Sequence, residues 1–267
     1  MDVRNFQNCR KIDLSQPLYN GMPHIAAVSE FIYTMVNQHG NRINEAGVSI
    51  ASDMICTPTH IGTHIDALGH VSKYGCLHGG VEARTAQTGR TGLAVHGIEH
   101  VEPVIRRGVL LDIAAALGVG MLDGRTEIGR GLLEEAASRQ NVAIQKGDIV
   151  LVRTGWIRQW NDAQRYLAPE QPGVNLEGMA WLAEFGIFAC GSDTAFFEKM
   201  PAQFEVHAFC LAEKGIHIME NMNLEELSSA RAYEFTLVVL PLKIIGATAS
   251  PVRPVALLEE REAGNGT

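Results

Sequence analysis

The stretch DIVLVRTG at residues 148–155 predicts a buried β-strand, because a short run of apolar and β-branched residues ends there in a glycine turn. Three other stretches share this pattern, and turn-forming residues bound each of them: GVLLDI at 108–113, GIFACG at 186–191 and FTLVVLPL at 235–242. Together these four runs predict the buried strands of a sheet.

Helical patterns lie between the predicted strands. Apolar residues recur at helical intervals over 126–139, and residues 203–214 predict a further helix that Gly215 ends. Asn175 is a suitable N-cap for a third helix, which Gly186 would end. Strands that alternate with helices favour the α/β class, here with mixed strand pairing.

The chain as a whole predicts one domain over residues 1–267, because no linker or repeat divides it. The segment SIASDMICT at 49–57 is compatible with a strand that leads into the residues that follow. The polar, glycine-containing end of the chain at 258–267 is expected to be a frayed tail.

Composition argues against several classes of partner. The net charge is −8, from 22 basic and 30 acidic residues, and no block is rich in lysine or arginine. Nucleic acid and membrane surfaces are therefore not expected as partners. No apolar run reaches the roughly 18 residues of a membrane span, and the first residues lack a signal peptide pattern. Five scattered cysteines without a C-x-x-C pair favour the reducing cytoplasm.

The stretch HIGTHIDALGH at 60–70 contains three histidines and one aspartate within eleven residues, which makes it the main candidate for a functional site. Imidazole and carboxylate are ordinary ligands of Zn²⁺ and Mn²⁺. In an extended segment His60, His64 and Asp66 would point to one side, and Gly62 would leave space between the imidazoles. An irregular Gly-Thr turn would bring the same three side chains together. Either geometry predicts a metal site with three protein ligands and room for water.

This stretch resembles the H-x-G-T-H-x-D-x-P-x-H signature of the cyclase-like metal hydrolases, a family that includes bacterial kynurenine formamidase and isatin hydrolase. Leu68 stands where the signature has proline. The resemblance continues through segments in the same order along the chain: DLSQPLYNGMP (13–23), GDIVLVRTGW (147–156), GSDTAFFE (191–198), HAFCLAEKGIHIMENMNLEEL (207–227) and PLKIIGATASPVRPVAL (241–257).

The resemblance implies further site residues. It places His207 and Glu220 as ligands of a second metal ion, with Asp66 bridging the two ions. Taken alone, His207 is compatible with a half-buried structural histidine and Glu220 with a solvated acid. The resemblance permits one or two ions per chain, and it does not separate Zn²⁺ from Mn²⁺. His70 is interpreted as the general acid/base, with a role in holding a ligand or the substrate as the alternative.

The function expected from these residues is hydrolysis by a metal-activated water. The bond would be a C–N or C–O bond of a small carbonyl substrate such as an amide, a cyclic amide, an aryl formamide or a lactone. Two alternatives remain open: an arylformamidase of tryptophan breakdown, and a metal-binding protein without turnover. The resemblance also implies a swivelling β/β/α-type fold with flanking helices, and a homodimer or homotetramer.

Overall fold

One mixed sheet of nine strands organises the molecule, which a computed structural model describes for residues 9–259. Its spatial order is β1 (Arg10–Asp13), β15 (Val255–Leu258), β13 (Glu234–Val239), β7 (Val104–Asp112), β9 (Ile149–Arg153), β11 (Ala189–Ser192), β12 (His217–Glu220), β4 (His64–Asp66) and β14 (Ala249–Pro251). The four central strands from β7 to β12 are parallel, and the outer pairs are antiparallel. The predicted α/β class with mixed pairing is confirmed.

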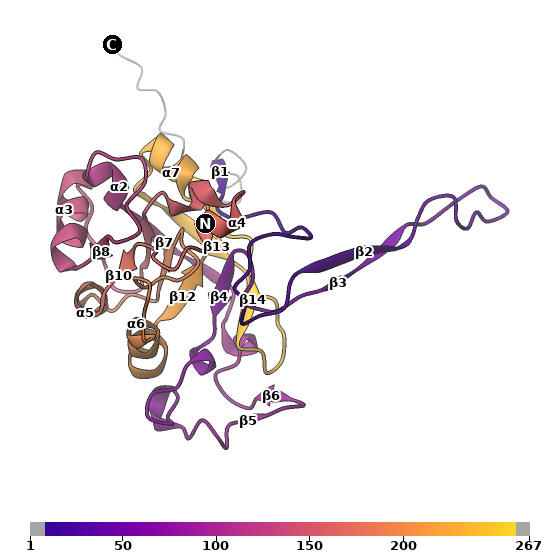
Figure 1. The fold of residues 1–267 in the computed structure, drawn as a ribbon, viewed down its shortest axis with the longest axis horizontal. Helices are drawn as coiled ribbons and strands as arrows, with labels where there is room; N and C mark the ends of the chain where they lie inside the picture. The colour runs from indigo at the N-terminus through magenta and orange to yellow at the C-terminus, as the bar shows by residue number, and fades with distance from the viewer. Residues whose placement is uncertain (1–8, 260–267) are drawn as a thin grey trace, which may run out of the picture.

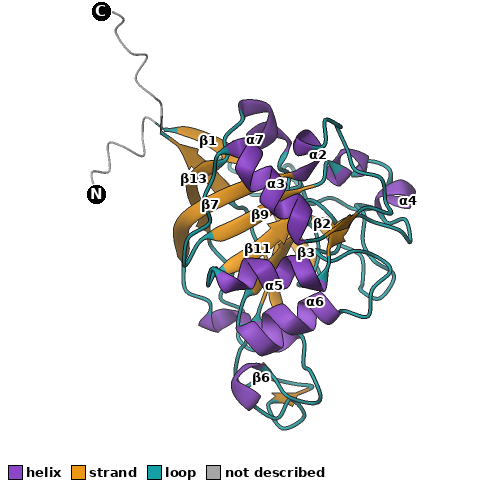
Figure 2. Ribbon diagram, turned by 90° about the vertical axis from the view of Figure 1, so that its left-hand side faces the viewer, coloured by secondary structure: helices purple, strands orange, loops and turns teal. Residues whose placement is uncertain are grey.

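The two faces of the sheet bury alternate residues of the predicted strands. In β9, Val150 and Val152 pack into one apolar cluster, while Ile149 and Leu151 pack into another on the opposite face. Both faces are covered, so a parallel strand reads as a continuous apolar run rather than an alternating one. Figure 2 shows α3 (Arg130–Gln140) and α5 (Leu176–Glu184) lying over one face of the sheet, in front of β9 and β11.

The remaining helices are short. The α-helices are α2 (Ile113–Ala116), α4 (Ala163–Tyr166), α6 (Glu205–His207) and α7 (Glu225–Ala230), and a π-helix, η5 (Ala208–Lys214), continues α6. The 3-10 helices are η1 (Leu68–His70), η2 (His78–Gly80), η3 (Ile98–His100) and η4 (Trp156–Gln159), and the small ladders pair β8 (Glu127–Ile128) with β10 (Gly173–Val174) and β5 (Gln87–Thr88) with β6 (Gly92–Leu93).

Two helix predictions need correction in detail. The helix expected over 126–139 begins only at Arg130, because residues 127–128 pair with β10 instead. The helix expected over 203–214 is α6 followed by the π-helix, and it ends at Gly215, whose φ is +69°. Asn175 caps α5 as predicted, because its side chain accepts a hydrogen bond from the Gly178 amide.

A long hairpin projects from the body of the molecule (Figure 1). We call it the arm: β2 (Ile32–Asn37), β3 (Ser52–Cys56) and the connection between them. The segment 49–57 is indeed partly a strand, but β3 pairs only with β2 and returns from the tip of the arm. Every residue of β3 and all but Asn37 of β2 are exposed.

Among the described residues, no helix has the length and apolar character needed to cross a bilayer. The tail predicted at 258–267 lies outside the described residues except for Leu258, which ends β15, and Glu259.

Candidate metal centre

The turn before β4 gathers the first three predicted ligands. His64 and Asp66 point to one side of the strand, and His60 joins them because Gly62 turns the chain with φ +54°. The irregular Gly-Thr turn is therefore the geometry found, rather than one extended segment. A Cβ atom at Gly62 would lie 2.5 Å from the Leu18 side chain, so both the conformation and the space favour glycine.

The ligand atoms of these three residues lie close together, but two of them have no hydrogen-bond partner. His60 Nδ1 lies 2.9 Å and His64 Nε2 lies 3.5 Å from Asp66 Oδ1. Yet within the described chain His64 Nε2 and Asp66 Oδ1 are buried without a hydrogen-bond partner. Atoms bound tetrahedrally to one zinc ion lie roughly 3.4 Å apart. The close but unpaired atoms thus fit the donor set of a divalent metal ion.

The other nitrogen of each imidazole is already engaged. His60 Nε2 lies 2.9 Å from the Thr248 hydroxyl, and His64 Nδ1 lies 2.9 Å from the Gly62 carbonyl oxygen. Such contacts fix the orientation of a ligating imidazole and choose the nitrogen that is left for the metal. Both rings are therefore held with the free nitrogen toward Asp66.

The structure brings His207 and Glu220 to the same place. Glu220 is the register partner of His64 across the β12–β4 ladder, and Glu220 Oε2 lies 3.5 Å from His64 Nε2. His207 Nε2 lies 3.1 Å from Glu220 Oε1. Both side chains are almost fully buried, so Glu220 is not the solvated acid that its sequence position alone allowed.

Electrostatics make the centre attractive to a cation. Burial opposes ionisation of Asp66, but the neighbouring imidazoles, His70 and His60 foremost, lower its pKa below the ordinary value. Burial also disfavours a charged His207, but the Glu198 and Glu220 carboxylates outweigh it and raise the pKa of His207. Several carboxylates thus share one buried region, where the positive charge of a metal ion would stabilise them.

His70 lies beside the trio, at the end of the 3-10 helix η1. Its ring is 4.0 Å from the His60 ring, centroid to centroid. The residue as a whole is exposed, but its ring is packed among the buried groups of the centre. Desolvation of the ring, with help from His60 and His207, lowers the pKa of His70 to about 4 against the opposing charge of Asp66. Leu68 begins this helix, a position that also accepts proline, and Ala67 before it is extended. The backbone at Leu68 is therefore one that the proline of the signature could also adopt.

A cavity of about 250 Å³ opens onto the centre. His60, His64, His70, His207 and Glu220 lie at its base. Its walls are mainly apolar, and they come from Ile25, Val28, Leu167, Phe196 and Phe204. No lysine or arginine of the described chain lines it. The centre thus has a small, largely apolar chamber in front of it.

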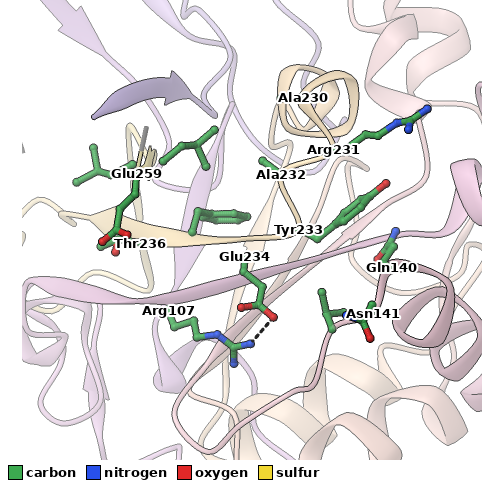
Figure 3. A pocket seen from close by; sticks show the side chains of 14 residues that line it. Arg107, Gln140, Asn141, Ala230, Arg231, Ala232, Tyr233, Glu234, Thr236 and Glu259 are labelled. Carbon is green, nitrogen blue, oxygen red and sulfur yellow. Dashed lines mark ion pairs between the residues drawn. The ribbon is translucent and has the colours of Figure 1, made fainter. Parts of the chain in front are cut away.

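A larger hollow of about 950 Å³ lies elsewhere, against β7 and β13 (Figure 3). No histidine or cysteine of residues 9–259 lines it, and Arg107 there is paired with Glu234 at 3.0 Å. This hollow lacks the groups for metal-assisted chemistry, whereas the smaller cavity has them.

The sequence did not predict several contacts around the centre. Glu198 contacts His207, the Phe197 amide contacts Glu220, and Asn221 lines the cavity next to Glu220. Glu198 ends the segment GSDTAFFE, but its spacing from His207 carries no periodic signal, so the contact is visible only in three dimensions.

Comparison with known proteins supports the relationship that the residues suggest. The family model described as "Putative cyclase" matches residues 12–199. The kynurenine formamidase of Paracidovorax citrulli is 24% identical over 246 residues, which cover 91% of this chain and 94% of that protein.

Solved structures agree in fold. The crystal structure of a novel cyclase is similar with a TM-score of 0.86 and 29% identity, covering 96% of this chain and 89% of the other. Isatin hydrolase A from Ralstonia solanacearum is similar with a TM-score of 0.74 and 22% identity, covering 95% and 93% of the two chains. The match to the family model extends over well more than half of the sequence, and the chain belongs to the cyclase family.

Proposed function

We propose that this chain is a metal-dependent hydrolase that cleaves a C–N or C–O bond of a small carbonyl compound. His60, His64 and Asp66 would hold the first metal ion, and His207 and Glu220 would hold a second. The observation that carries the proposal is the pair of buried, unpartnered ligand atoms, His64 Nε2 and Asp66 Oδ1, beside an apolar cavity. The donor set of imidazoles and carboxylates accepts Zn²⁺ or Mn²⁺.

A divalent ion bound there supplies a nucleophilic water at neutral pH and polarises the substrate carbonyl. Side chains of the protein carry out the proton transfer and bind the substrate. His70 is neutral near pH 7 because its pKa is low, so its imidazole is free to accept a proton and pass it to the departing nitrogen or oxygen. Asn221 lines the cavity, and its Oδ1 accepts a hydrogen bond from the Tyr166 hydroxyl at 2.7 Å. Its amide nitrogen therefore remains as a donor for a carbonyl oxygen.

The lining of the cavity favours a neutral substrate with an apolar or aromatic body. Phe196 and Phe204 provide aromatic walls, and no lysine or arginine of the described residues lines the cavity to hold a carboxylate. A cyclic amide, a lactone or a neutral aryl formamide fits this chemistry. The competing candidate is arylformamidase, which the likeness to kynurenine formamidase favours. That activity requires the cavity to accept the charged amino-acid group of N-formylkynurenine.

The test combines metal analysis with a substrate panel. Protein purified without a metal-affinity tag is analysed for bound metals, beside His64→Ala and the matched surface variant His100→Ala. It is then assayed on isatin, an aryl lactone, formanilide and N-formylkynurenine. We expect the wild type and His100→Ala to contain Zn or Mn and to hydrolyse a neutral substrate, and His64→Ala to lose both properties.

Other outcomes would separate the alternatives. A preference for N-formylkynurenine would establish the arylformamidase instead. Bound metal without turnover of any carbonyl compound would favour the non-catalytic metal-binding protein. Absence of metal from the wild type, even after incubation with Zn²⁺ and Mn²⁺, would contradict the proposal.

The arm supports a homodimer or homotetramer as the working form. An isolated two-stranded hairpin is at best marginally stable, yet this one exposes Tyr33, Val36, Met54 and Ile55. Such exposed apolar surface is typical of an interface between chains. We propose a second copy of this chain as the partner, because the arm reaches well beyond its own body (Figure 1).

The cytoplasm is the location that the cysteines favour. Cys56, Cys76, Cys190 and Cys210 form no disulfide among the described residues, and Cys56 and Cys76 are exposed. Exposed free thiols persist in a reducing compartment, whereas oxidising compartments favour disulfides. Fractionation of cells that express the untagged protein tests this location.

A further inference from the structure

Glu198 is a buried acid that contacts one of the proposed ligands twice. Its side chain is almost fully buried. Glu198 Oε1 accepts a hydrogen bond from the backbone N–H of His207 at 3.0 Å, and the same oxygen contacts His207 Nδ1. A carboxylate is an acceptor only, so the Nδ1 atom of a neutral His207 must carry the proton of this contact.

The contact determines which nitrogen of His207 is left for other partners. Nε2 lies 3.1 Å from Glu220 Oε1, and in the metal-free chain a proton on Nε2 makes this contact a hydrogen bond. Because Glu198 keeps the proton on Nδ1, Nε2 is the nitrogen that would lose its proton and offer a lone pair to a metal ion. The ring is thus presented with its basic nitrogen toward the metal centre. The second contact, to the backbone, fixes the first turn of the helix that carries His207 relative to the same carboxylate.

The neighbouring residue holds the other proposed ligand of the second ion. The Phe197 amide donates a hydrogen bond to Glu220 Oε1 at 2.8 Å. Two consecutive residues, Phe197 and Glu198, therefore contact Glu220 and His207 respectively. Residues far apart in the sequence are oriented by one short segment.

That segment is itself held in place. The Val174 amide donates to the Phe197 carbonyl oxygen at 3.1 Å, and the Lys199 amide donates to the Val174 carbonyl oxygen at 3.2 Å. The two hydrogen bonds flank Glu198 on both sides. Gly173 allows the close approach, because a Cβ atom there would lie 2.3 Å from the Glu198 carbonyl carbon. The Glu198 backbone is thus part of a ladder rather than a free loop.

We propose that Glu198 is a positioning residue that holds His207 with Nδ1 protonated and so prepares His207 and Glu220 to bind the second ion. The inference rests on the proposed function for the identity of the ligand, a divalent metal ion. It adds a residue that contacts neither substrate nor metal but sets the affinity of one of the two ion sites.

The experiment measures how much metal each ion site binds, separately from turnover. Wild type, Glu198→Ala, Glu198→Gln and the control Glu225→Ala are equilibrated with a series of buffered free Zn²⁺ concentrations, and bound zinc is counted per chain. Glu225 is the control because it is another glutamate whose carboxylate pairs with basic side chains, those of Arg153 and Arg158, but it lies outside the metal centre. Circular dichroism and thermal unfolding verify that each variant folds.

We expect the wild type and Glu225→Ala to bind two ions. In Glu198→Ala the second ion should bind 10- to 100-fold more weakly, as is usual when the partner of a ligating histidine is lost, while the first ion is unchanged. Glu198→Gln keeps an oxygen acceptor for Nδ1–H and should lose less than Glu198→Ala. If Glu198→Ala fails to fold, the intermediate loss in Glu198→Gln still tests the proposal.

Two results would overturn the inference and leave the proposed function standing: an active wild type with only one bound ion, or unchanged affinity for the second ion in Glu198→Ala and Glu198→Gln. A wild type that binds no metal and hydrolyses nothing would instead remove the proposed function itself. Activity is measured in parallel so that these cases are distinguished.

Discussion

His64 and Glu220 are direct register partners across the β4–β12 ladder, and their side chains meet with Nε2 and Oε2 3.5 Å apart. The ladder joins the histidine motif of the N-terminal half to the C-terminal half of the chain. Because side chains of paired residues lie on the same face of a sheet, strand register alone brings the two proposed half-sites together. A shift of one residue would turn His64 toward the core.

Replacement of His70 tests its role in proton transfer. We expect His70→Gln to lower kcat about 10²- to 10⁴-fold with metal content unchanged, since general acid–base catalysis contributes on that order. The wild-type rate should fall as the pH drops toward the low pKa of His70, and the variant should lack that dependence. His100→Gln, at an exposed histidine, is the control. A higher KM with kcat almost unchanged would favour the role in holding substrate.

Replacement of Gly62 tests the turn that brings His60 to His64. We expect Gly62→Ala to lower the free energy of unfolding by about 1–2 kcal/mol or more, because an L-residue is strained at φ +54°. The added Cβ would also meet Leu18. Gly118→Ala is a matched control, since Gly118 has φ +70° and open space around it. Both variants should lower stability in chemical denaturation, but only Gly62→Ala should lose metal; equal metal content would argue against the turn as a determinant.

The raised pKa of Asp193 leads us to predict a specific dependence of stability on pH. Burial raises the pKa of Asp193 to about 6, although hydrogen bonds from Thr154 and Gly155 oppose the shift. The folded state therefore holds the proton more tightly than the unfolded state, whose carboxyl titrates near 3.8. The contribution of this group is fully present below that value and is lost as the pH rises toward 6.

The measurement is the free energy of unfolding of metal-free wild type minus that of Asp193→Asn, between pH 4 and pH 7. We expect this difference to decrease by about 2 to 3 kcal/mol over that range, from the shift of about two pKa units. An increase with pH would mean that the three donated hydrogen bonds outweigh burial.

The exposed apolar residues of the arm lead us to predict the oligomeric state. We expect wild type to be a dimer or tetramer in light scattering coupled to size exclusion, and Val36→Asp with Ile55→Asp to be monomeric. Both residues are more than half exposed in the single chain. Tyr74→Asp is the control, because Tyr74 is 97% exposed and lies outside the arm. A monomeric wild type would contradict the second copy as partner.

Much of the fold followed from local sequence patterns. The apolar runs of β9 and β11 were recognisable because strands buried on both faces are continuously apolar. Asn175 marked the start of α5, since its side chain satisfies an amide that the helix leaves free. These features depend on neighbours in the sequence, so one sequence is enough to predict them.

The arm and the surroundings of the metal centre did not follow from the sequence. The strand at Ser52–Cys56 was expected to lead into the histidine cluster, but its partner is β2 and both its faces are exposed. Apolar residues give an exposed strand the same sequence pattern as a core strand. The sequence does not show whether other parts of the chain pack against it. Glu198 was missed because its contact with His207 depends on the ladder with Val174, which no local pattern encodes.

The position of β4 has a consequence for biosynthesis. This strand of three residues pairs with β12 on one side and with β14 on the other, and Ser250 of β14 is the register partner of Ile65. Both partners are synthesised long after β4 has left the ribosome. A growing chain therefore carries its histidine motif unpaired until β12 and β14 have been synthesised, and the five proposed ligands can come together only after that.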